Sequence, residues 1–176
     1  GNALNTVSST YNLTWDKLYV SNAGNDITGY GTLSEPYATM NKAYVSAKEE
    51  STIYIMDDIT AIETTTFNSN KDITLTSSDS SGNTGNNIIS TVTRGNSLTS
   101  YVLNETSGEL TLENITIDGN NVEAISSMIK FASNGVINTG TTIQNAISNY
   151  DNGAAVRIAA GATLSIEGGE ISNNHG

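Results

Sequence analysis

The chain has 176 residues, enough for one domain, and 36% of them are hydrophobic, so a core can form. Only 14% are charged, and the net charge of −11 would repel nucleic acid or an anionic membrane surface, so we expect neither as a partner. No apolar run is long enough for a membrane-inserted helix, and the absence of cysteine excludes disulfides and thiolate sites. The abundant Asn, Ser, Thr and Gly are instead typical of short strands joined by many turns.

The first distinct element is a segment with helical spacing, EPYATMNKAYVSAKEE, at Glu35–Glu50. Its Pro36 suits the first turn of a helix, and one apolar face would be formed by Tyr37, Met40, Tyr44 and Ala47. Terminal units of repeat proteins are usually caps, because an open end would expose the core and the strand edges. We therefore expect residues 1–50 to contain an N-terminal strand and a capping α-helix.

Strand-like segments follow at Ser51–Thr60 and Lys71–Ser77. Within the second, Ile73 and Leu75 should occupy the same positions in their repeat as Leu110 and Leu112 do later in the chain. The spacing between these positions exceeds the later repeat period, which indicates an insertion. The segment SSDSSGNTGNN at Ser77–Asn87 has the composition of such a loop.

Three later stretches share one pattern, in which an aliphatic residue is followed seven positions on by a second one and then by a polar turn. They are LTLENITIDGN (Leu110–Asn120), VINTGTTIQNA (Val136–Ala146) and LSIEGGEISNN (Leu164–Asn174), and their first residues lie 26 and 28 positions apart. A further strand per repeat falls 28 and 27 residues apart, at YVL (Tyr101–Leu103), IKF (Ile129–Phe131) and VRI (Val156–Ile158). A period of about 27 residues with three strands indicates a solenoid.

Side chains alternate along a strand, so each repeat has inward and outward positions. We expect inward side chains at Leu110, Leu112, Val136, Leu164 and Ile166. The residues between them should face outward, namely Thr111, Ile137 and Ser165. At the turns, we expect Asn145 to stack over Asn173.

The predicted fold is an all-β solenoid, a right-handed parallel β-helix with three short strands per coil of about 27 residues and an N-terminal capping α-helix. Leucine-rich repeats have a similar period, but their Leu-rich pattern is absent. Residues 51–176 would form four to five coils of one structural domain. No cap follows the strands of Gly161–Gly176, so we expect the β-helix to be truncated at its C-terminal end and to self-associate end to end through the open coil.

Several of these motifs resemble known sequences. Tyr19–Tyr44 resembles the entry segment of many secreted right-handed β-helix proteins of the pectin-lyase-like superfamily, with a strand, a Gly/Asn/Asp loop, a proline and a capping helix. The motifs GAAVRI, ISNN and LTLENITIDGN resemble repeats of bacterial surface β-helices of the adhesin and polymorphic outer-membrane-protein type, although NGAAV stands where those repeats prefer Gly-Gly. The resemblance covers most of the chain from about Tyr19. It implies a secreted or cell-surface bacterial protein, with a signal peptide that is not in this chain.

Catalytic signals are weak. Lyases on β-helices need a base and acidic residues gathered around calcium, which requires acids on neighbouring coils. The outward columns do not supply them: they read Glu113, Thr139, Glu167; Asp118, Gln144, Ser172; and Thr116, Thr142, Glu170. The adjacent Asp57 and Asp58 suit a solvated turn, and the single histidine, His175, is next to last. We therefore expect no catalytic residue, no metal site and no cofactor.

The one column of neighbouring like charges is Lys130 over Arg157, both facing outward. Either nearby acids neutralise them, namely Glu105, Glu123 or Asp151, or they form a binding site for a uronate or sulfate. A second group, the aromatic residues Tyr11, Trp15, Tyr19 and Tyr30, could stack on a sugar or pack the N-terminal strand onto the cap.

Two functions fit these features. The first is a non-catalytic secreted or cell-surface module, stalk-like or adhesin-like, that binds a polysaccharide or a host glycan through Lys130 and Arg157. The alternative is the N-terminal part of a carbohydrate-active enzyme, a polysaccharide lyase or glycoside hydrolase, with its active site beyond residue 176. We expect the first of these two functions for this chain.

Overall fold

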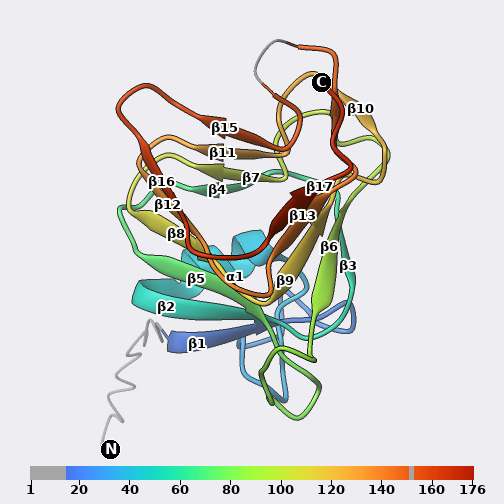
Figure 1. The fold of residues 1–176 in the computed structure, drawn as a ribbon. Coiled ribbons are helices and arrows are strands. Elements are labelled where there is room, and N and C mark those ends of the chain that lie inside the picture. Colours follow the sequence, from blue (N-terminus) through green and yellow to red (C-terminus); the bar gives the residue numbers. More distant parts are fainter. Residues whose placement is uncertain (1–14, 151–152) are drawn as a thin grey trace, which may run out of the picture.

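The computed structural model describes residues 15–150 and 153–176. The fold is all-β apart from one short helix, and every strand pair in the described residues is parallel. The strands form three main sheets that surround a common interior (Figure 1). This arrangement agrees with the parallel all-β class predicted from the repeats.

Each main sheet gathers strands from successive stretches of the chain. The first sheet has the order β1 (Trp15–Val20), β2 (Ala47–Ile55), β5 (Ile73–Ser77), β8 (Glu109–Leu112), β12 (Asn134–Ile137) and β16 (Thr163–Ile166). The second has β3 (Ile59–Ala61), β6 (Ser90–Arg94), β9 (Ile115–Asp118), β13 (Thr142–Gln144) and β17 (Glu170–Ser172). The third has β4 (Thr65–Phe67), β7 (Leu103–Glu105), β11 (Ile129–Phe131) and β15 (Val156–Ile158), and a small pair joins β10 (Glu123–Ala124) to β14 (Ile147–Ser148).

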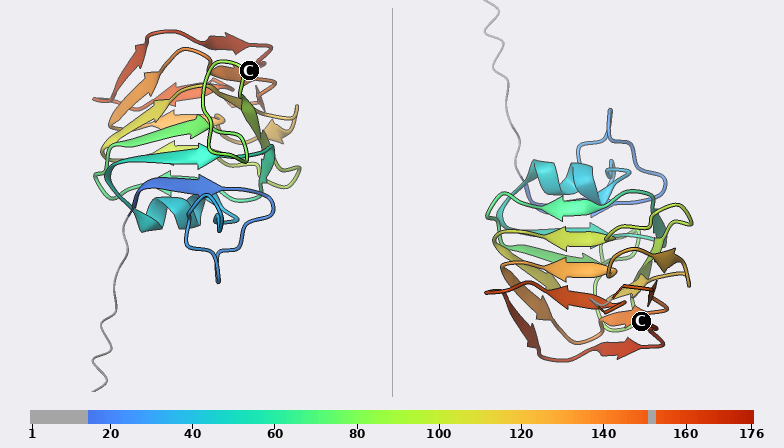
Figure 2. Two further views of the ribbon diagram at one scale, coloured as in Figure 1. Left: turned by 90° about the horizontal axis from the view of Figure 1, so that it is seen from below. Right: turned by 90° about the horizontal axis from the view of Figure 1, so that it is seen from above.

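From β2 onward the chain passes from the first sheet to the second and then to the third, and repeats this order. Successive repeats therefore lie on one another as layers, from α1 and β1 at one end to β15, β16 and β17 at the other (Figure 2). Inward aliphatic side chains from all three sheets meet in one core, and Ile117, Leu112 and Ile129 are each fully buried. Burial of this apolar column along the layers is the main stabilising term of the fold.

The predicted register is correct in the second sheet, where Ile143 pairs with both Ile117 and Ile171. It is also correct for Ile73 and Leu75, which pair with Leu110 and Leu112. The insertion is confirmed as well, because the long connection between β5 and β6 contains the predicted loop.

The prediction that Val136 faces inward and Ile137 outward is wrong. Gly135 pairs with Leu110 and Leu164, while Val136 pairs with Thr111 and Ser165. Ile137 is fully buried and Val136 is partly exposed. The shift arises because the turn between β12 and β13 is one residue longer than its neighbours, with Gly140 at φ +71°.

Gly135 thus occupies an inward position, and the ring of Phe131 fills the space that a side chain there would take. A Cβ added to Gly135 would overlap Cδ1 of Phe131 and lie 2.7 Å from its Cγ. Phe131 itself is fully buried. One large residue from the preceding strand therefore replaces the missing aliphatic residue.

The third-sheet strand placed at Tyr101–Leu103 is also shifted. Strand β7 begins at Leu103, which pairs with Ile129, so Tyr101 lies outside the strand by two residues. Just before the strand, the N–H of Val102 donates to the carbonyl of Met128, the residue that precedes β11, at 2.8 Å.

The helix is shorter than predicted. Helix α1 spans Met40–Ser46, and Thr39 rather than Pro36 precedes it, with its hydroxyl accepting the N–H of Lys42 at 3.1 Å. Asp26 holds this start, because its carboxylate accepts the hydroxyl of Thr39 at 2.7 Å. The helix ends where Ala47 enters β2. The predicted apolar residues Tyr37, Met40, Tyr44 and Ala47 are nonetheless all buried.

The outer edge of β1 is covered. The N–H of Tyr19 donates to Gly31 at 2.9 Å, and the N–H of Tyr37 donates to Tyr19 at 2.9 Å. Helix α1 packs against β1, β2 and β4 at the same end (Figure 2). No helix in the described residues is long and apolar enough to cross a membrane.

Candidate functional site

The outward face of the third sheet carries a ladder of polar residues at one register position. Thr66 of β4 pairs with Asn104 of β7, Asn104 pairs with Lys130 of β11, and Lys130 pairs with Arg157 of β15. The neighbours of Lys130 on its strand, Ile129 and Phe131, are fully buried, so the alternation of the strand directs Lys130 outward. The predicted side-by-side placement of the two cations is therefore confirmed.

Tyr101 joins these two cations and was not singled out from the sequence. The Nζ of Lys130 lies 5.8 Å from the centre of its ring. Its hydroxyl oxygen accepts a hydrogen bond from Nη1 of Arg157 at 3.3 Å. All three side chains are half-buried. The aromatic face attracts the ammonium group and the phenol oxygen orients the guanidinium, so both cations contact one tyrosine side chain. We call Tyr101, Lys130 and Arg157 the cationic face.

The acids expected to neutralise these cations are engaged elsewhere. The carboxylate of Glu105 is buried inside the third sheet, where Oε2 accepts the N–H groups of Ala132 at 2.9 Å and Ser133 at 2.8 Å. Burial raises the pKa of this carboxyl, while those two hydrogen bonds and the charge of Lys130 act in the opposite direction.

Glu123 does not form an ion pair with either cation. Glu123 accepts a hydrogen bond from the side-chain amide of Asn149, and Asp151 lies outside the described residues. Within residues 15–150 and 153–176, the ion pair found joins Lys48 to Asp16 at 3.8 Å, and neither Lys130 nor Arg157 forms one. None of the described carboxylates therefore forms an ion pair with the cationic face.

Other cations of the chain serve the fold. The Nζ of Lys71 donates to the carbonyl of Ala47 at 2.6 Å. Arg94 is fully buried, and its Nη2 donates to the carbonyls of Ser100 at 3.1 Å and Ser127 at 3.3 Å. Burial lowers the pKa of Arg94. Neither side chain belongs to a cationic surface.

The adjacent acids Asp57 and Asp58 bind the chain itself. Asp57 accepts the hydroxyl of Ser21 at 2.6 Å, and Asp58 accepts the N–H of Thr91 at 2.7 Å. These bonds tie the loop after β1 and the start of β6 to the end of β2. In the part of the chain that the structure describes, no group of three or more His, Asp or Glu residues could hold a metal ion.

The aromatic group near the N-terminus is only partly described. The ring of Tyr19 stacks on that of Tyr54, with centroids 5.0 Å apart and an angle of 19° between the planes. Tyr30 is exposed. Tyr11 and the side chain of Trp15 lie outside what the structure describes. Tyr19 therefore packs against β2 rather than joining a common aromatic platform with Tyr30.

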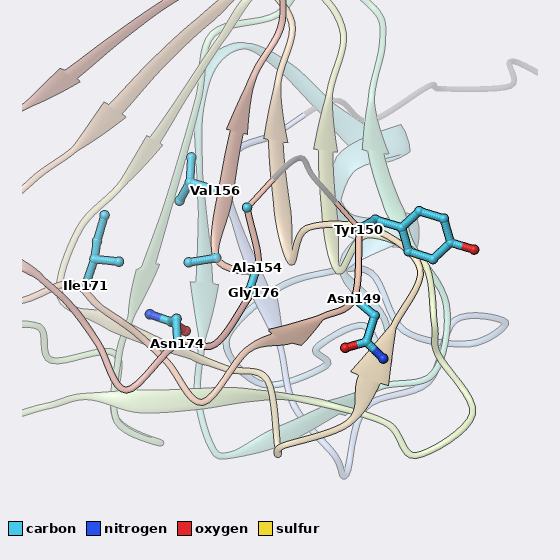
Figure 3. Close-up of a pocket in the computed structure, with 9 residues that line it drawn as sticks. Asn149, Tyr150, Ala154, Val156, Ile171, Asn174 and Gly176 are labelled. Carbon is cyan, nitrogen blue, oxygen red and sulfur yellow. The ribbon is translucent and has the colours of Figure 1, made fainter.

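A hollow of about 730 Å³ lies at the end of the layers opposite α1 (Figure 3). Its lining is mostly small or aliphatic and includes Ala154, Val156 and Ile171, with the amides of Asn149 and Asn174 at its sides. His175 is nearby in sequence, and its backbone N–H donates to the carbonyl of Ala146 at 2.8 Å. The residues lining the hollow include no Asp, Glu, His, Lys or Arg, and Tyr150 is the one titratable side chain among them.

No protein-family model, no curated protein and no solved structure matches this chain.

Proposed function

We propose that the chain is part of a right-handed parallel β-helix that serves as a non-catalytic, glycan-binding module of a secreted or cell-surface bacterial protein. Parallel strands in three sheets that the chain visits in a fixed order support the β-helix. Connections between parallel strands are almost always right-handed, which supports the handedness. The resemblance of the repeats to bacterial surface β-helices supports the location.

The observation that carries the binding proposal is the cationic face. Lys130 and Arg157 are register partners on neighbouring strands, so their Cα atoms lie about 4.8 Å apart. Like charges at this spacing repel, and no described carboxylate forms an ion pair with either of them. An anion placed between them would remove this repulsion.

The chemistry of the face fits an acidic sugar. A guanidinium binds a carboxylate or sulfate with two hydrogen bonds, and the ammonium of Lys130 adds a point charge. The half-buried ring of Tyr101 offers an apolar surface beside them. The ligand class is therefore a glycan that contains uronate or sulfate. Binding should be weak and should fade with salt, because the face is an open sheet surface and its attraction is screened.

The test is a glycan array with three proteins: wild type, Lys130→Ala/Arg157→Ala, and the control Lys17→Ala/Lys48→Ala, which changes the net charge equally. The wild type and the control should bind uronate or sulfated glycans, and the first variant should lose them. The proposal fails if the first variant retains all anionic glycans, if only neutral sugars bind, or if no glycan binds.

A further inference from the structure

The backbone of Tyr101 is fixed by the layers on both sides of it. Its carbonyl accepts the hydroxyl of Thr64, the residue just before β4, at 2.5 Å. The next residue, Val102, is fully buried, and its N–H donates to Met128 of the following layer. Hydrogen bonds to two neighbouring layers therefore fix the point from which the side chain of Tyr101 extends.

That side chain reaches along the direction of stacking. The third sheet has the order β4, β7, β11 and β15, so Arg157 on β15 lies two strands from β7, which begins just after Tyr101 (Figure 1). Two strand spacings amount to about 10 Å. The two side chains together cross this distance, because the phenol oxygen of Tyr101 lies 3.3 Å from Nη1 of Arg157. Lys130, on the strand between them, places its Nζ 5.8 Å from the ring centre, so polar groups from three layers gather at one ring.

All three polar groups keep hydrogen-bond donors that the chain does not use. Arg157 donates from Nη1 to Tyr101, and within residues 15–150 and 153–176 its Nε and Nη2 have no hydrogen-bond partner. The ammonium of Lys130 contacts the ring and forms no hydrogen bond or ion pair in the same part of the chain. The phenol oxygen accepts from Arg157, so the phenol hydrogen of Tyr101 remains able to donate to a ligand.

The strong acceptors on the adjacent strand are turned away from the cationic face. Asn104 is the register partner of Lys130, and its side-chain oxygen is buried. The next residue, Glu105, is fully buried and accepts backbone N–H groups with its carboxylate. The cationic face therefore consists mainly of donors, and a donor site selects a ligand group that only accepts hydrogen bonds, as an ionised oxyanion does.

The number of donor groups distinguishes between the oxyanions that a glycan can carry. A carboxylate has two oxygens in one plane, and the guanidinium of Arg157 alone can engage both of them. A sulfate or phosphate ester has three acceptor oxygens that diverge from the central atom, so it can accept from Arg157, Lys130 and the phenol of Tyr101 together. Given the proposed function, on which this step rests, we propose that the cationic face selects such a tetrahedral ester over a uronate. The O–H group of Tyr101 is the donor that distinguishes the two.

The test uses sugars that share one ring and differ in the group at the last carbon: galacturonate, galactose 6-sulfate and galactose 6-phosphate, with galactose as the uncharged reference. Titration of isotope-labelled protein, followed by NMR at the Nε–H of Arg157 and the backbone N–H of Tyr101, gives each Kd even where binding is weak. The wild type should bind at least one of the two esters more tightly than galacturonate, by about fivefold or more. The ester that binds more tightly identifies the source of the oxyanion.

The variant Tyr101→Phe isolates the phenol group. It keeps the ring that contacts Lys130 and removes the O–H, so the preference for the ester should fall below about twofold. The matched control Tyr30→Phe removes the phenol of an exposed tyrosine in the loop after β1 and should keep the full preference. Because the ratio of two affinities is measured, a general loss of structure in a variant would not imitate this result, and the NMR spectra show whether each variant is folded.

The outcomes separate the selectivity of the site from its existence. Equal binding of the esters and galacturonate, or a preference that survives in Tyr101→Phe, would overturn the selectivity and leave glycan binding intact. Absence of binding by every charged sugar would also overturn the selectivity. In that case the glycan array with Lys130→Ala/Arg157→Ala still decides the proposed function, because anionic glycans lost only in that variant support it and absence of all glycan binding refutes it.

Discussion

The contact between Gly135 and Phe131 gives a sharp test of the register. Phe131→Ala should lower the free energy of unfolding by about 3–5 kcal/mol, because it removes a fully buried ring. Gly135→Ala alone should cost about 1–3 kcal/mol, since the new Cβ would overlap the ring of Phe131. When the ring is absent, the same Cβ enters free space, and Gly135 has no positive φ that would oppose alanine.

The double variant should therefore be more stable than the sum of the single effects predicts, by about 1–3 kcal/mol. Urea unfolding followed by circular dichroism would measure all four proteins. The matched control combines Gly135→Ala with Phe67→Ala, the other phenylalanine, which is buried in β4. Additive effects of Gly135→Ala and Phe131→Ala, or equal coupling to Phe67, would refute the assignment of Gly135 to the inward column.

Three further predictions concern the helix, the buried acid and catalysis. Met40→Asp should lower the free energy of unfolding by about 3–5 kcal/mol, because it buries a charge. Val45→Asp, on the exposed side of α1, should change it little. Equal melting temperatures of the two variants would contradict this prediction. Because the pKa of Glu105 is raised in the fold, its carboxyl group adds to the free energy of unfolding at pH values below the unfolded-state pKa. This stabilisation is lost as pH rises through the folded-state pKa. The free energy of unfolding of wild type minus that of Glu105→Gln should thus fall as pH rises above the usual pKa of a glutamate, and a flat difference in urea unfolding would be evidence against it. Finally, the chain should not cleave pectin or alginate with or without calcium, and ultraviolet absorbance from unsaturated products would show the opposite.

The repeat period was visible in the sequence wherever connections keep their length. Ile117, Ile143 and Ile171 are register partners, and so are Lys130 and Arg157, so these columns of the sequence match the ladders of the structure. These residues gave both the parallel pairing and the two cations of the candidate site.

Three errors have local physical causes. The longer turn at Gly140 moved β12 by one residue, and an aliphatic pattern cannot show that Phe131 fills the place of Gly135. The helix was overextended because Ala47 suits both a helix face and the buried start of β2. Tyr101 was interpreted as a strand residue, so its contacts with Lys130 and Arg157 were missed. An aromatic residue just before a strand that precedes two aligned cations is the signal that could have found it.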